Sequence, residues 1–442
     1  MSNLNKLKNR LVSGKIVASK NILNNLHPSE LARLIESMPL NERAIIWEMI
    51  DQKIEGEILV EVSDEVRDGL LAKMDTNELI TAVEGMALDD LADLVADLPE
   101  TLMQEVIKSM DHQDRERLKQ VMSYDENSAG GLMNTDILTI RPDVTVEVVL
   151  KYLRSQNSIP NSTDSIFVVN RDNEYRGALL LSKLLTEDPE TPVSKIMSKK
   201  IHPINVESPS ENVVWEFENR DLLSAPVIDN QNKLLGRITI DDVVDVIRDE
   251  AEHSLMSAAG LDEEEDLFSP ATSSAKKRAI WLGVNLATAF LAASVVDIFE
   301  TALDKIVLLA ILMPIVPSMG GVAGTQSLTI MTRALALGHI DQSNTKGILK
   351  KEVLVGIING ILWAIVVGSI TFLWFQELLI GLVIAGAMSI NLVIAAIAGF
   401  SLPLMLRKLK IDPALAGGVM LTTITDVIGY ISFLGLGAIF LI

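Results

Sequence analysis

The spacing of hydrophobic and polar residues changes twice along the chain. From Asn24 to Tyr124, leucine and isoleucine recur at helical spacing, and Gly and Pro are scarce. From Met133 to about Arg248, short extended apolar runs alternate with helical patterns. Beyond Arg278, long apolar runs follow one another. The pattern predicts a multidomain membrane protein with an α-helical domain, an α/β region and an all-α membrane domain, in that order.

Three stretches of the first region read as pairs of short helices. They cover residues 27–50, 76–98 and 99–122, and each has Pro or Asp between its two apolar patterns. Short helix pairs cannot bury their apolar faces alone, so neighbouring pairs stack. We therefore expect a small superhelix over residues 21–127, preceded by a short amphipathic lead-in over residues 1–20.

The α/β region repeats one pattern over residues 128–195 and 196–246. In each copy an extended segment and a helix precede two strands joined by a polar turn, RDNEYRG or DNQNKLLG, and a second helix follows. The two copies resemble a tandem pair of CBS domains, a module that often binds small ligands. The resemblance implies ATP as a candidate ligand, because Thr239 and Asp242 keep the Thr-x-x-Asp spacing that such pairs use on a ribose. The first copy lacks the acid at that place.

Five apolar runs in the last region, residues 276–442, are long enough to cross a bilayer, which takes about 20 residues. Basic residues are concentrated before the first run and after the second and fourth runs. By the positive-inside rule, the N-terminal domains then lie in the cytoplasm and Ile442 outside, in a plasma (inner) membrane. The polar N-terminus has no signal-peptide core, so we expect none. The expected spans are 279–299, 306–332, 353–375, 378–406 and 414–441.

Composition narrows the possible partners. The chain has no Cys, so a disulfide framework and a thiolate metal site are excluded. Eight basic and eight acidic side chains after Arg278 cancel, so the formal net charge of −21 lies in the first 278 residues. An acidic region attracts cations and repels nucleic acid, so we expect no nucleic-acid partner. We see no nucleophile–base constellation and no phosphate-binding loop, and we expect no enzyme.

One carboxylate lies in the middle of the last apolar run. Asp426 follows the hydroxyls of Thr422, Thr423 and Thr425. A charge at mid-membrane costs roughly 3 kcal/mol on insertion scales, so it must face water, a cation or a protein partner. A structural carboxylate capped by neighbouring donors is one interpretation. A cation site in a pore is the other, and we favour it.

The second apolar run contains residues that interrupt a helix. Pro314 and Pro317 are expected to break it, and broken helices at membrane depth are tolerated where they line a cavity. A kinked packing helix is the alternative. Glycines in this run allow close approach of another helix, and polar side chains can face a cavity. These glycines are Gly320, Gly321 and Gly324, and the polar side chains are Gln326, Ser327 and Thr329.

Two predicted helices have carboxylates three or four residues apart, which places them on one helix face. The second helix is expected from about Asp241 to Ala259 and enters an acidic connecting (plug) segment over residues 247–275. One acidic face is usually a solvated surface, but two beside ligand-type modules favour cation binding. Mg²⁺ suits loosely grouped carboxylates because it keeps several waters. The acids are Asp90, Asp93 and Asp97 on the first helix, and Asp242, Asp245, Asp249 and Glu252 on the second.

Four stretches complete a wider resemblance. They read SAGGLMNTD, PSMGGVAGTQS, RKLKIDPALAGG and TTITDVIGY. With the order of domains, they make essentially the whole chain similar to the MgtE family of magnesium channels and transporters. The resemblance implies a homodimer in the lipid bilayer, with a central pore lined by the second and fifth spans. It implies that Asp426 selects the ion and that Mg²⁺ is both substrate and regulator.

The same resemblance implies which acids sense cytoplasmic Mg²⁺. They are Asp90, Asp93, Glu211, Asp221, Asp242, Asp245 and Glu250. The chain departs from the family pattern at Val322, where the second-span motif usually has Asn. It also has no sensing carboxylate at Pro209, His253 or Ser254, where some members have one.

Two other functions remain open from the sequence. The chain can be a transporter of another divalent ion, such as Mn²⁺, Co²⁺ or Zn²⁺. It can also be a non-conducting membrane sensor in which the CBS pair binds a nucleotide. Oxygen-only ligands favour hard ions over the softer ones. A flux assay with several divalent ions distinguishes all three functions.

Overall fold

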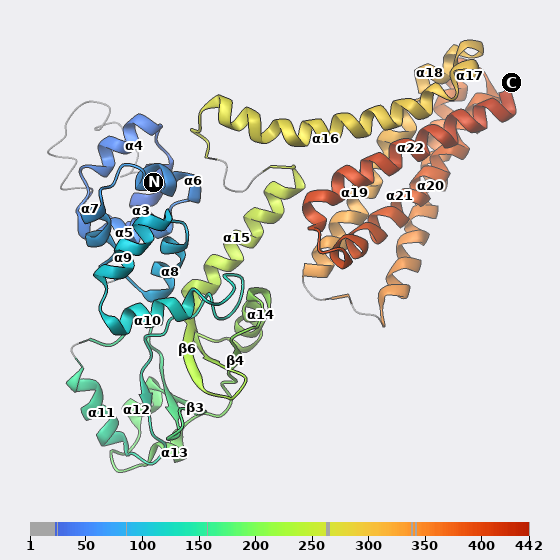
Figure 1. Ribbon diagram of the computed structural model, residues 1–442. Coiled ribbons are helices and arrows are strands. Elements are labelled where there is room, and N and C mark those ends of the chain that lie inside the picture. Colours follow the sequence, from blue (N-terminus) through green and yellow to red (C-terminus); the bar gives the residue numbers. More distant parts are fainter. Residues whose placement is uncertain are drawn as a thin grey trace. The chain divides into compact units, whose positions relative to one another are not determined.

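The computed structural model describes residues 23, 25–84, 86–156, 158–261, 266–336, 339–340 and 343–441. The expected lead-in over residues 1–20 lies outside them. The chain divides into two compact units (Figure 1). The first runs to Ala251 and includes the segment that ends at Ser269, and the second holds residues 252–263 and 270–442.

Among the described residues, eight short helices lie in the first part of the first unit (Figure 1), and six of them are the helices of the three predicted pairs. Acidic N-caps fix where several begin, because Asp51, Asp75 and Asp111 accept hydrogen bonds from N–H groups of the first turn. The helices are α3 (Pro28–Glu36), α4 (Leu40–Trp47), α5 (Gln52–Glu61), α6 (Asp64–Leu71), α7 (Thr76–Val83), α8 (Leu88–Ala96), α9 (Glu100–Ser109) and α10 (His112–Val121).

These helices stack as a superhelix. Helix α3 packs on α5, α5 on α7 and α7 on α9. The three expected pairs correspond to α3–α4, α7–α8 and α9–α10. A further pair, α5–α6, was missed because Gly56 and the buried Glu55 interrupt its apolar pattern. A Cβ at Gly56 would lie 2.1 Å from the carbonyl oxygen of Ala82, so glycine lets α5 and α7 approach closely.

A short segment from later in the chain packs on the helical domain within the same unit. Arg43 and Asp266 form a buried bidentate ion pair, with N–O distances of 2.6 and 2.7 Å. The Arg43 guanidinium also lies 5.6 Å from the centre of the Phe268 ring. Removing one partner of a buried pair leaves an uncompensated charge, at a cost of about 3–5 kcal/mol. The pair therefore fixes residues 266–269 to the helical domain.

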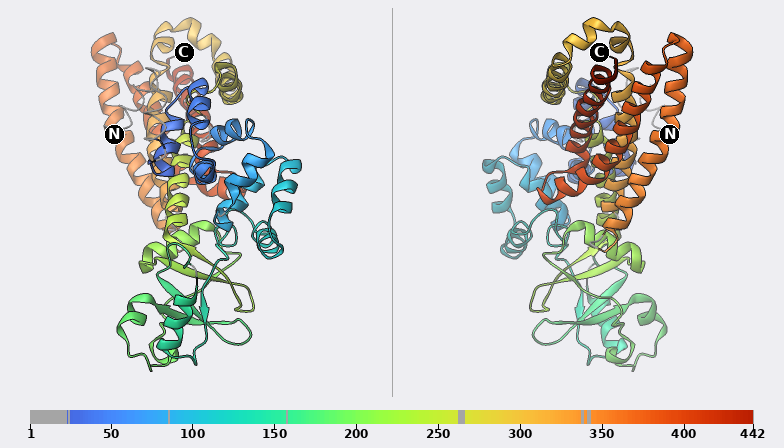
Figure 2. Two further views of the ribbon diagram at one scale, coloured as in Figure 1. Left: turned by 90° about the vertical axis from the view of Figure 1, so that its left-hand side faces the viewer. Right: turned by 90° about the vertical axis from the view of Figure 1, so that its right-hand side faces the viewer.

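Two three-stranded sheets follow, one for each copy of the α/β pattern (Figure 2, teal to green). In each sheet the first two strands are parallel and the last two antiparallel. The elements are β1 (Thr139–Ile140), α11 (Val146–Ser155), β2 (Ser165–Val169), β3 (Tyr175–Leu180), α12 (Leu181–Thr186), α13 (Val193–Ile196), β4 (Ile204–Asn205), α14 (Ser210–Arg220), β5 (Ser224–Ile228) and β6 (Leu234–Thr239).

The segment that leads into this region, residues 128–134, packs on the second sheet. The N–H groups of Ala129 and Gly130 donate to carbonyl oxygens just after β4. Asn134 pairs with Arg237 on β6 through both backbone hydrogen bonds. Residues 128–134, which precede the first α/β copy in the sequence, therefore contact the second copy.

Helix α15 (Ile240–Ala258) is the acidic helix expected from about Asp241 to Ala259. Figure 1 shows it as one continuous helix. It begins in the first compact unit and ends in the second. The chain passes between the two units again on either side of residues 264–269.

Among the described residues, five helical spans of the second unit are long and apolar enough to cross a membrane, as the sequence predicted. The second span, Val307–Ala336, consists of α18 and α19. It is interrupted once, at Met313 and Pro314. The expectation that Pro317 also breaks it is wrong, because Pro317 lies in the first turn of α19, where a missing N–H leaves no helical bond unmade. The helices are α16 (Ala271–Asp297), α17 (Glu300–Lys305), α18 (Val307–Leu312), α19 (Ile315–Ala336), α20 (Thr345–Phe375), α21 (Leu378–Lys408) and α22 (Pro413–Leu441).

Helix α21 is the centre of this unit. It packs on α19, α20 and α22, and Figure 2 shows α20 to α22 running alongside one another in orange and red. Small buried residues on α21, including Ala387, Ala395 and Gly399, allow these close contacts. Helix α16 differs, because only 6% of its most apolar stretch is buried. Most of its apolar surface is therefore exposed in the single chain.

Candidate cation sites

Asp426 lies in the middle of α22 and is half-buried. No donor from the described part of the chain bonds its carboxylate. In an apolar helix, a carboxylate without such donors depends on water or a cation for solvation. The geometry of the single chain therefore allows Asp426 to bind an ion.

The three threonines before Asp426 donate their hydroxyl protons to their own helix. The acceptors are carbonyl oxygens one turn earlier, those of Gly418, Val419 and Leu421. Thr425 is fully buried, whereas Thr422 is exposed and Thr423 half-buried. With the proton used, the lone pairs of Thr422 and Thr423 remain as acceptors, which is what a hydrated cation contacts.

Gly320 and Gly324 on α19 lie at close helix contacts, as expected. A Cβ at Gly324 would lie 2.8 Å from the side chain of Leu421 on α22. A Cβ at Gly320 would lie 2.2 Å from the amide nitrogen of Asn391 on α21. Both glycines therefore let α19 pack against its two neighbours.

Gly321 has a different environment. A Cβ at Gly321 would meet Thr422 and Thr425 at an ordinary 3.9 Å. The structure thus brings α19 alongside the hydroxyls that precede Asp426. Gln326, the other polar residue expected here, is exposed on α19.

A second carboxylate of this unit was not singled out from the sequence. Glu352, in the first turns of α20, is buried at 5% exposure and accepts a hydrogen bond of 2.9 Å from Ser327 on α19. Its place just before the expected third span made it look like a loop residue. Ser327, expected to face a cavity, instead joins α19 to α20.

The end of α15 contacts the start of α22 within the second unit. His253 Nε2 lies 3.2 Å from a carboxylate oxygen of Asp412. Asp412 also accepts hydrogen bonds from the N–H groups of Ala414 and Leu415. Asp412 therefore caps the helix that contains Asp426 and holds the end of α15 to it.

In the first unit, α8 and the start of α15 bring carboxylates together. Burial, with the charges of Asp242 and Asp93, raises the pKa of Asp90 to about 7. Burial, with the charge of Asp89, raises the pKa of Asp242 to about 7. These acids from two helices therefore repel one another, and a bound cation would relieve that repulsion.

Asp89 was missed in the sequence because it lies off the face shared by Asp90 and Asp93. Burial, with the charge of Asp90, raises the pKa of Asp89 to about 6, although Asn134 donates a hydrogen bond of 3.1 Å to it. The available signal was an acid at a position that helical periodicity otherwise makes apolar, between Leu88 and Leu91. We name Asp89, Asp90 and Asp242 the α8–α15 acid cluster.

The remaining predicted sensing acids are not members of the α8–α15 acid cluster. Asp97 follows the end of α8 and pairs with Arg67 at 2.6 Å. Arg248 lies 3.0 Å from Asp245 and 3.3 Å from Asp249. The structure therefore gives several of these acids an arginine partner. Asp93 lies beside Asp90, and burial, with the charges of Glu126 and Asp89, raises the pKa of Asp93 to about 7. Glu211, Asp221 and Glu250, which form no ion pair with an arginine among the described residues, are exposed.

Thr239 and Asp242, the candidate nucleotide ligands, bond to each other. The N–H and hydroxyl of Thr239 both lie 3.0 Å from one Asp242 carboxylate oxygen. Thr239 is 6% exposed. The Asp242 carboxylate therefore caps the start of α15, and the Thr239 hydroxyl is buried against it.

No three His, Asp or Glu side chains in the described ranges converge as a ready metal-binding group. Mg²⁺ accepts this arrangement better than most metals, since it binds through one or two carboxylates and keeps waters. The carboxylate chemistry of the α8–α15 acid cluster therefore fits a hydrated hard cation. Asp90 and Asp242 would be the residues that hold it.

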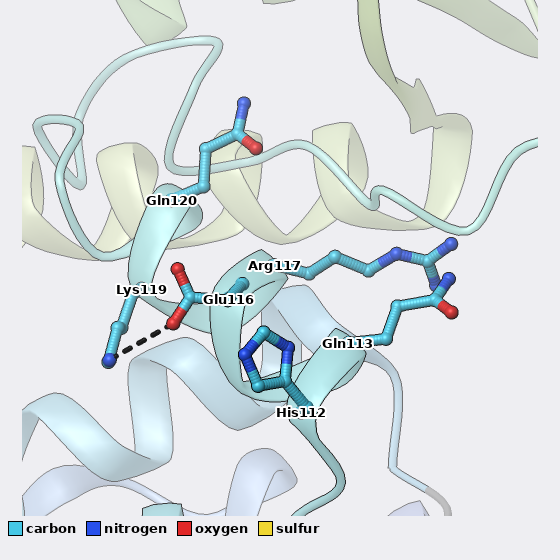
Figure 3. Close-up of a pocket in the computed structure, with 6 residues that line it drawn as sticks. All are labelled: His112, Gln113, Glu116, Arg117, Lys119 and Gln120. Atoms are coloured by element: carbon cyan, nitrogen blue, oxygen red, sulfur yellow. Dashed lines mark hydrogen bonds and ion pairs between the residues drawn. The ribbon is translucent and has the colours of Figure 1, made fainter.

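A hollow elsewhere in the first unit does not resemble a binding site. Figure 3 shows that its lining side chains all project from α10, among them an exposed ion pair of Glu116 and Lys119 at 3.2 Å. Sites for small ligands are concave and enclosed by several elements. We therefore assign this hollow no ligand.

The raised pKa values predict how the first unit responds to pH. The native pKa values of Asp89, Asp90 and Asp242 exceed the unfolded value, so the native state binds more protons between about pH 4 and 7. Stability therefore falls as pH rises through this window. We expect a fragment of residues 1–269 without divalent ions to melt at a higher temperature at pH 6 than at pH 8, by roughly 2–4 °C for each kcal/mol.

Calorimetry at both pH values measures this difference. Mg²⁺ should narrow it, because a cation relieves the same repulsion at pH 8. The matched control is Asp97→Asn, which removes an acid with an arginine partner and should leave the difference unchanged. A melting temperature that is equal or lower at pH 6 would contradict the prediction.

Family models match three parts of the chain. Residues 26–127 match the MgtE intracellular N domain. Residues 129–190 and 193–249 match the CBS domain. Residues 313–436 match MgtE, described as a divalent cation transporter. The matches follow the helical domain, the two α/β copies and most of the membrane helices.

Similar proteins cover most of the chain. A magnesium transporter MgtE from Enterococcus faecalis (strain ATCC 700802 / V583) is 30% identical over 324 residues, which are 73% of this chain and 71% of the relative. One from Bacillus subtilis (strain 168) is 27% identical over 431 residues, 98% of this chain and 96% of the relative. A crystal structure of the cytosolic domain of the Mg²⁺ channel MgtE in complex with ATP has a TM-score of 0.51 at 28% identity, and the match covers 55% of this chain and 99% of that one.

Proposed function

The chain belongs to the MgtE family of divalent cation transporters, and from this we propose that it is a homodimeric, Mg²⁺-selective channel or transporter. One observation carries the proposal. Asp426 lies in the middle of an apolar helix, without donors from the described residues, and Thr422 and Thr425 just before it lie beside Gly321 on α19. A divalent cation with its water shell supplies both the charge and the solvation that this carboxylate needs.

Mg²⁺ in such a site keeps most of its waters. It dehydrates reluctantly and demands octahedral oxygen ligands. A pair of Asp426 carboxylates across a twofold axis provides negative charge at a distance, and the acceptor oxygens of Thr422 and Thr423 contact the water shell. Gly321 leaves room beside Thr422. The site then attracts a hydrated divalent ion without enclosing it.

The apolar surface of the protomer supports a dimer. Helix α16 exposes large apolar side chains, with Ile280, Leu282 and Phe290 each exposed by 67–69%. Lipid covers part of such a surface, and a second chain covers the rest. We propose that α19 and α22 of two protomers line the route of the ion. Closed twofold symmetry is the commonest arrangement for such an assembly.

The distribution of basic residues sets the proposed orientation. Lysines and arginines lie in the first turns of α16, from the last turn of α19 to the first turns of α20, and at the end of α21, which places those ends in the cytoplasm. The first unit then lies in the cytoplasm and Ile442 outside, in a plasma membrane. Internal Mg²⁺ can therefore reach the α8–α15 acid cluster and act as a signal of cellular supply.

Gating by internal Mg²⁺ follows from that cluster. Without a cation, Asp89, Asp90 and Asp242 repel one another, and α8 is pushed from the start of α15. With a bound cation the two helices are held together, which shifts a two-state equilibrium by the usual 1–3 kcal/mol or so of allosteric coupling. The sensing acids without an arginine partner in the described part of the chain, Asp93, Glu211, Asp221 and Glu250, would bind further ions weakly.

The route to the pore helix is α15 itself. It begins beside the cluster and ends at the contact between His253 and Asp412, which caps α22. A change at Asp242 therefore displaces a helix that is joined to the one containing Asp426. We propose that the closed state is the one in which α15 holds the start of α22 in place.

ATP is a proposed second ligand of the first unit. The solved cytosolic domain of a similar protein contains ATP. In this chain a ribose would compete with the hydrogen bonds between Thr239 and Asp242. Nucleotide and Mg²⁺ would then both act on Asp242, so binding of one would change the affinity for the other.

Ion flux into proteoliposomes tests the proposal. Purified protein is reconstituted, and internal Mg²⁺ is followed with an indicator dye at low and high Mg²⁺ on the cytoplasmic side. We expect Mg²⁺ uptake that high cytoplasmic Mg²⁺ suppresses. Faster flux of Mn²⁺, Co²⁺ or Zn²⁺ than of Mg²⁺ would show that the transported ion is one of these and not Mg²⁺. Absence of flux for every ion would leave a non-conducting sensor and overturn the proposal.

A further inference from the structure

A buried amide joins three membrane helices near Asp426. Asn391 on α21 is 0% exposed, and its Nδ2 donates a hydrogen bond of 2.8 Å to the carbonyl oxygen of Val316 on α19. Its Oδ1 has no hydrogen-bond partner among the described residues. Among the described residues, the side chain therefore makes one of the four hydrogen bonds that an amide can form.

Two glycines make the space that Asn391 occupies. A Cβ at Gly320 on α19 would lie 2.2 Å from the Asn391 nitrogen. A Cβ at Gly429 on α22 would lie 3.1 Å from the same atom and 2.9 Å from Pro317. The amide thus fills the junction at which α19, α21 and α22 meet, and no alanine fits at Gly320 without a shift.

Stability of the fold does not explain an amide at this place. A buried oxygen without a partner is unfavourable, and a leucine of similar size would fill the junction without it. The amide instead fixes how α21 is aligned with α19, because its hydrogen bond joins α21 to one particular carbonyl group of α19. Buried polar groups are best attested as devices that fix a register between helices.

We propose that Asn391 is a positioning residue that sets the spacing of α19 and α22, and through it the ion selectivity. The inference rests on the proposed transport function. Gly321, the residue after Gly320, lies beside Thr422 and Thr425, and Gly429 follows Asp426 on α22 by three residues. A change at the junction therefore moves α19 relative to Asp426. An ion that crosses with its waters is sensitive to that distance.

A coupled pair of substitutions tests the contact. Gly320→Ala should lower Mg²⁺ flux by about tenfold in the otherwise natural chain, because the new methyl meets the Asn391 amide. In an Asn391→Ala background the same change should lower flux by less than about threefold, since the obstacle is gone. Gly386→Ala, on the same helix as Asn391 at an ordinary 3.4 Å contact, is the control and should be neutral in both backgrounds. If Gly320→Ala lowers Mg²⁺ flux by the same factor in both backgrounds, the contact between residue 320 and Asn391 does not cause the loss of flux, and the inference is overturned.

Selectivity separates positioning from mere folding. Asn391→Leu keeps the volume and removes the hydrogen bond, so we expect it to fold and to change the ratio of Mg²⁺ to Ca²⁺ flux by about threefold or more. A loss of folded protein would lower both fluxes equally and leave the ratio unchanged. Size-exclusion chromatography measures the folded amount. An unchanged ratio in folded Asn391→Leu overturns the inference while the proposed function stands. Absence of Mg²⁺ flux in the natural chain overturns both.

Discussion

Mg²⁺ flux through the Asp426→Asn variant is expected to fall by about 100-fold or more. Asparagine has the size and shape of aspartate, so the packing of α22 is kept and only the charge is lost. Attraction between a carboxylate and a divalent ion a few ångströms away is worth about 3 kcal/mol or more at the effective dielectric of a half-buried site. A dimer loses two such charges, so the energy barrier that the ion crosses rises by more than the attraction to one carboxylate. An increase of that size lowers flux below detection in the proteoliposome assay.

The matched control for Asp426→Asn is Glu377→Gln. Glu377 is an exposed carboxylate of the same unit, located where α21 begins, and its side chain makes no capping hydrogen bond. Its neutralisation should leave flux within about twofold of the natural chain, because exposed charges act weakly through water. Flux that survives in Asp426→Asn would remove this carboxylate from the ion route. Glu352, buried against Ser327, would then be the next carboxylate to test.

The order of domains and the five membrane helices were predictable because hydropathy reports burial directly. An apolar run long enough to cross a bilayer has few other folded uses. Breaks within a run are harder to predict. Both Pro314 and Pro317 lack an N–H, but only the first lies where the helix needed one. The residue at which a helix resumes depends on packing, which the sequence does not state.

The candidate sites were predictable only as far as helical spacing goes. Spacing placed Asp97 with Asp90 and Asp93, but α8 ends at Ala96, and Asp97 pairs with Arg67 instead. Spacing also left out Asp89, which joins the cluster because its charge lies close enough to Asp242 on α15 to raise the pKa of that acid. Asn391 and Glu352 have roles that depend on contacts between helices distant in sequence. A pattern along one helix cannot show which charge the opposite helix brings.

Neutralising the α8–α15 acid cluster is expected to make closure less sensitive to internal Mg²⁺. In the variant with Asp90→Asn and Asp242→Asn, the two helices no longer repel, and the cation has no charge to bridge. The Mg²⁺ concentration for half-closure should rise by about tenfold, within the usual range of coupling between sites. Flux at low internal Mg²⁺ should stay, because Asp426 is unchanged. Titration of cytoplasmic Mg²⁺ during proteoliposome flux measures both quantities.

The control pair for this variant is Asp97→Asn with Asp249→Asn. It removes the same number of charges from the same part of the chain, one just beyond α8 and one on α15, but both acids have an arginine partner. If local repulsion is the sensor, this pair should shift half-closure by less than about threefold, since exposed pairs contribute little. If both pairs shift it equally, closure responds to total charge and not to the cluster. Protons offer a further check, because the pKa values of Asp90 and Asp242 near 7 mean that pH 6 should mimic Mg²⁺ in the natural chain and not in the cluster variant.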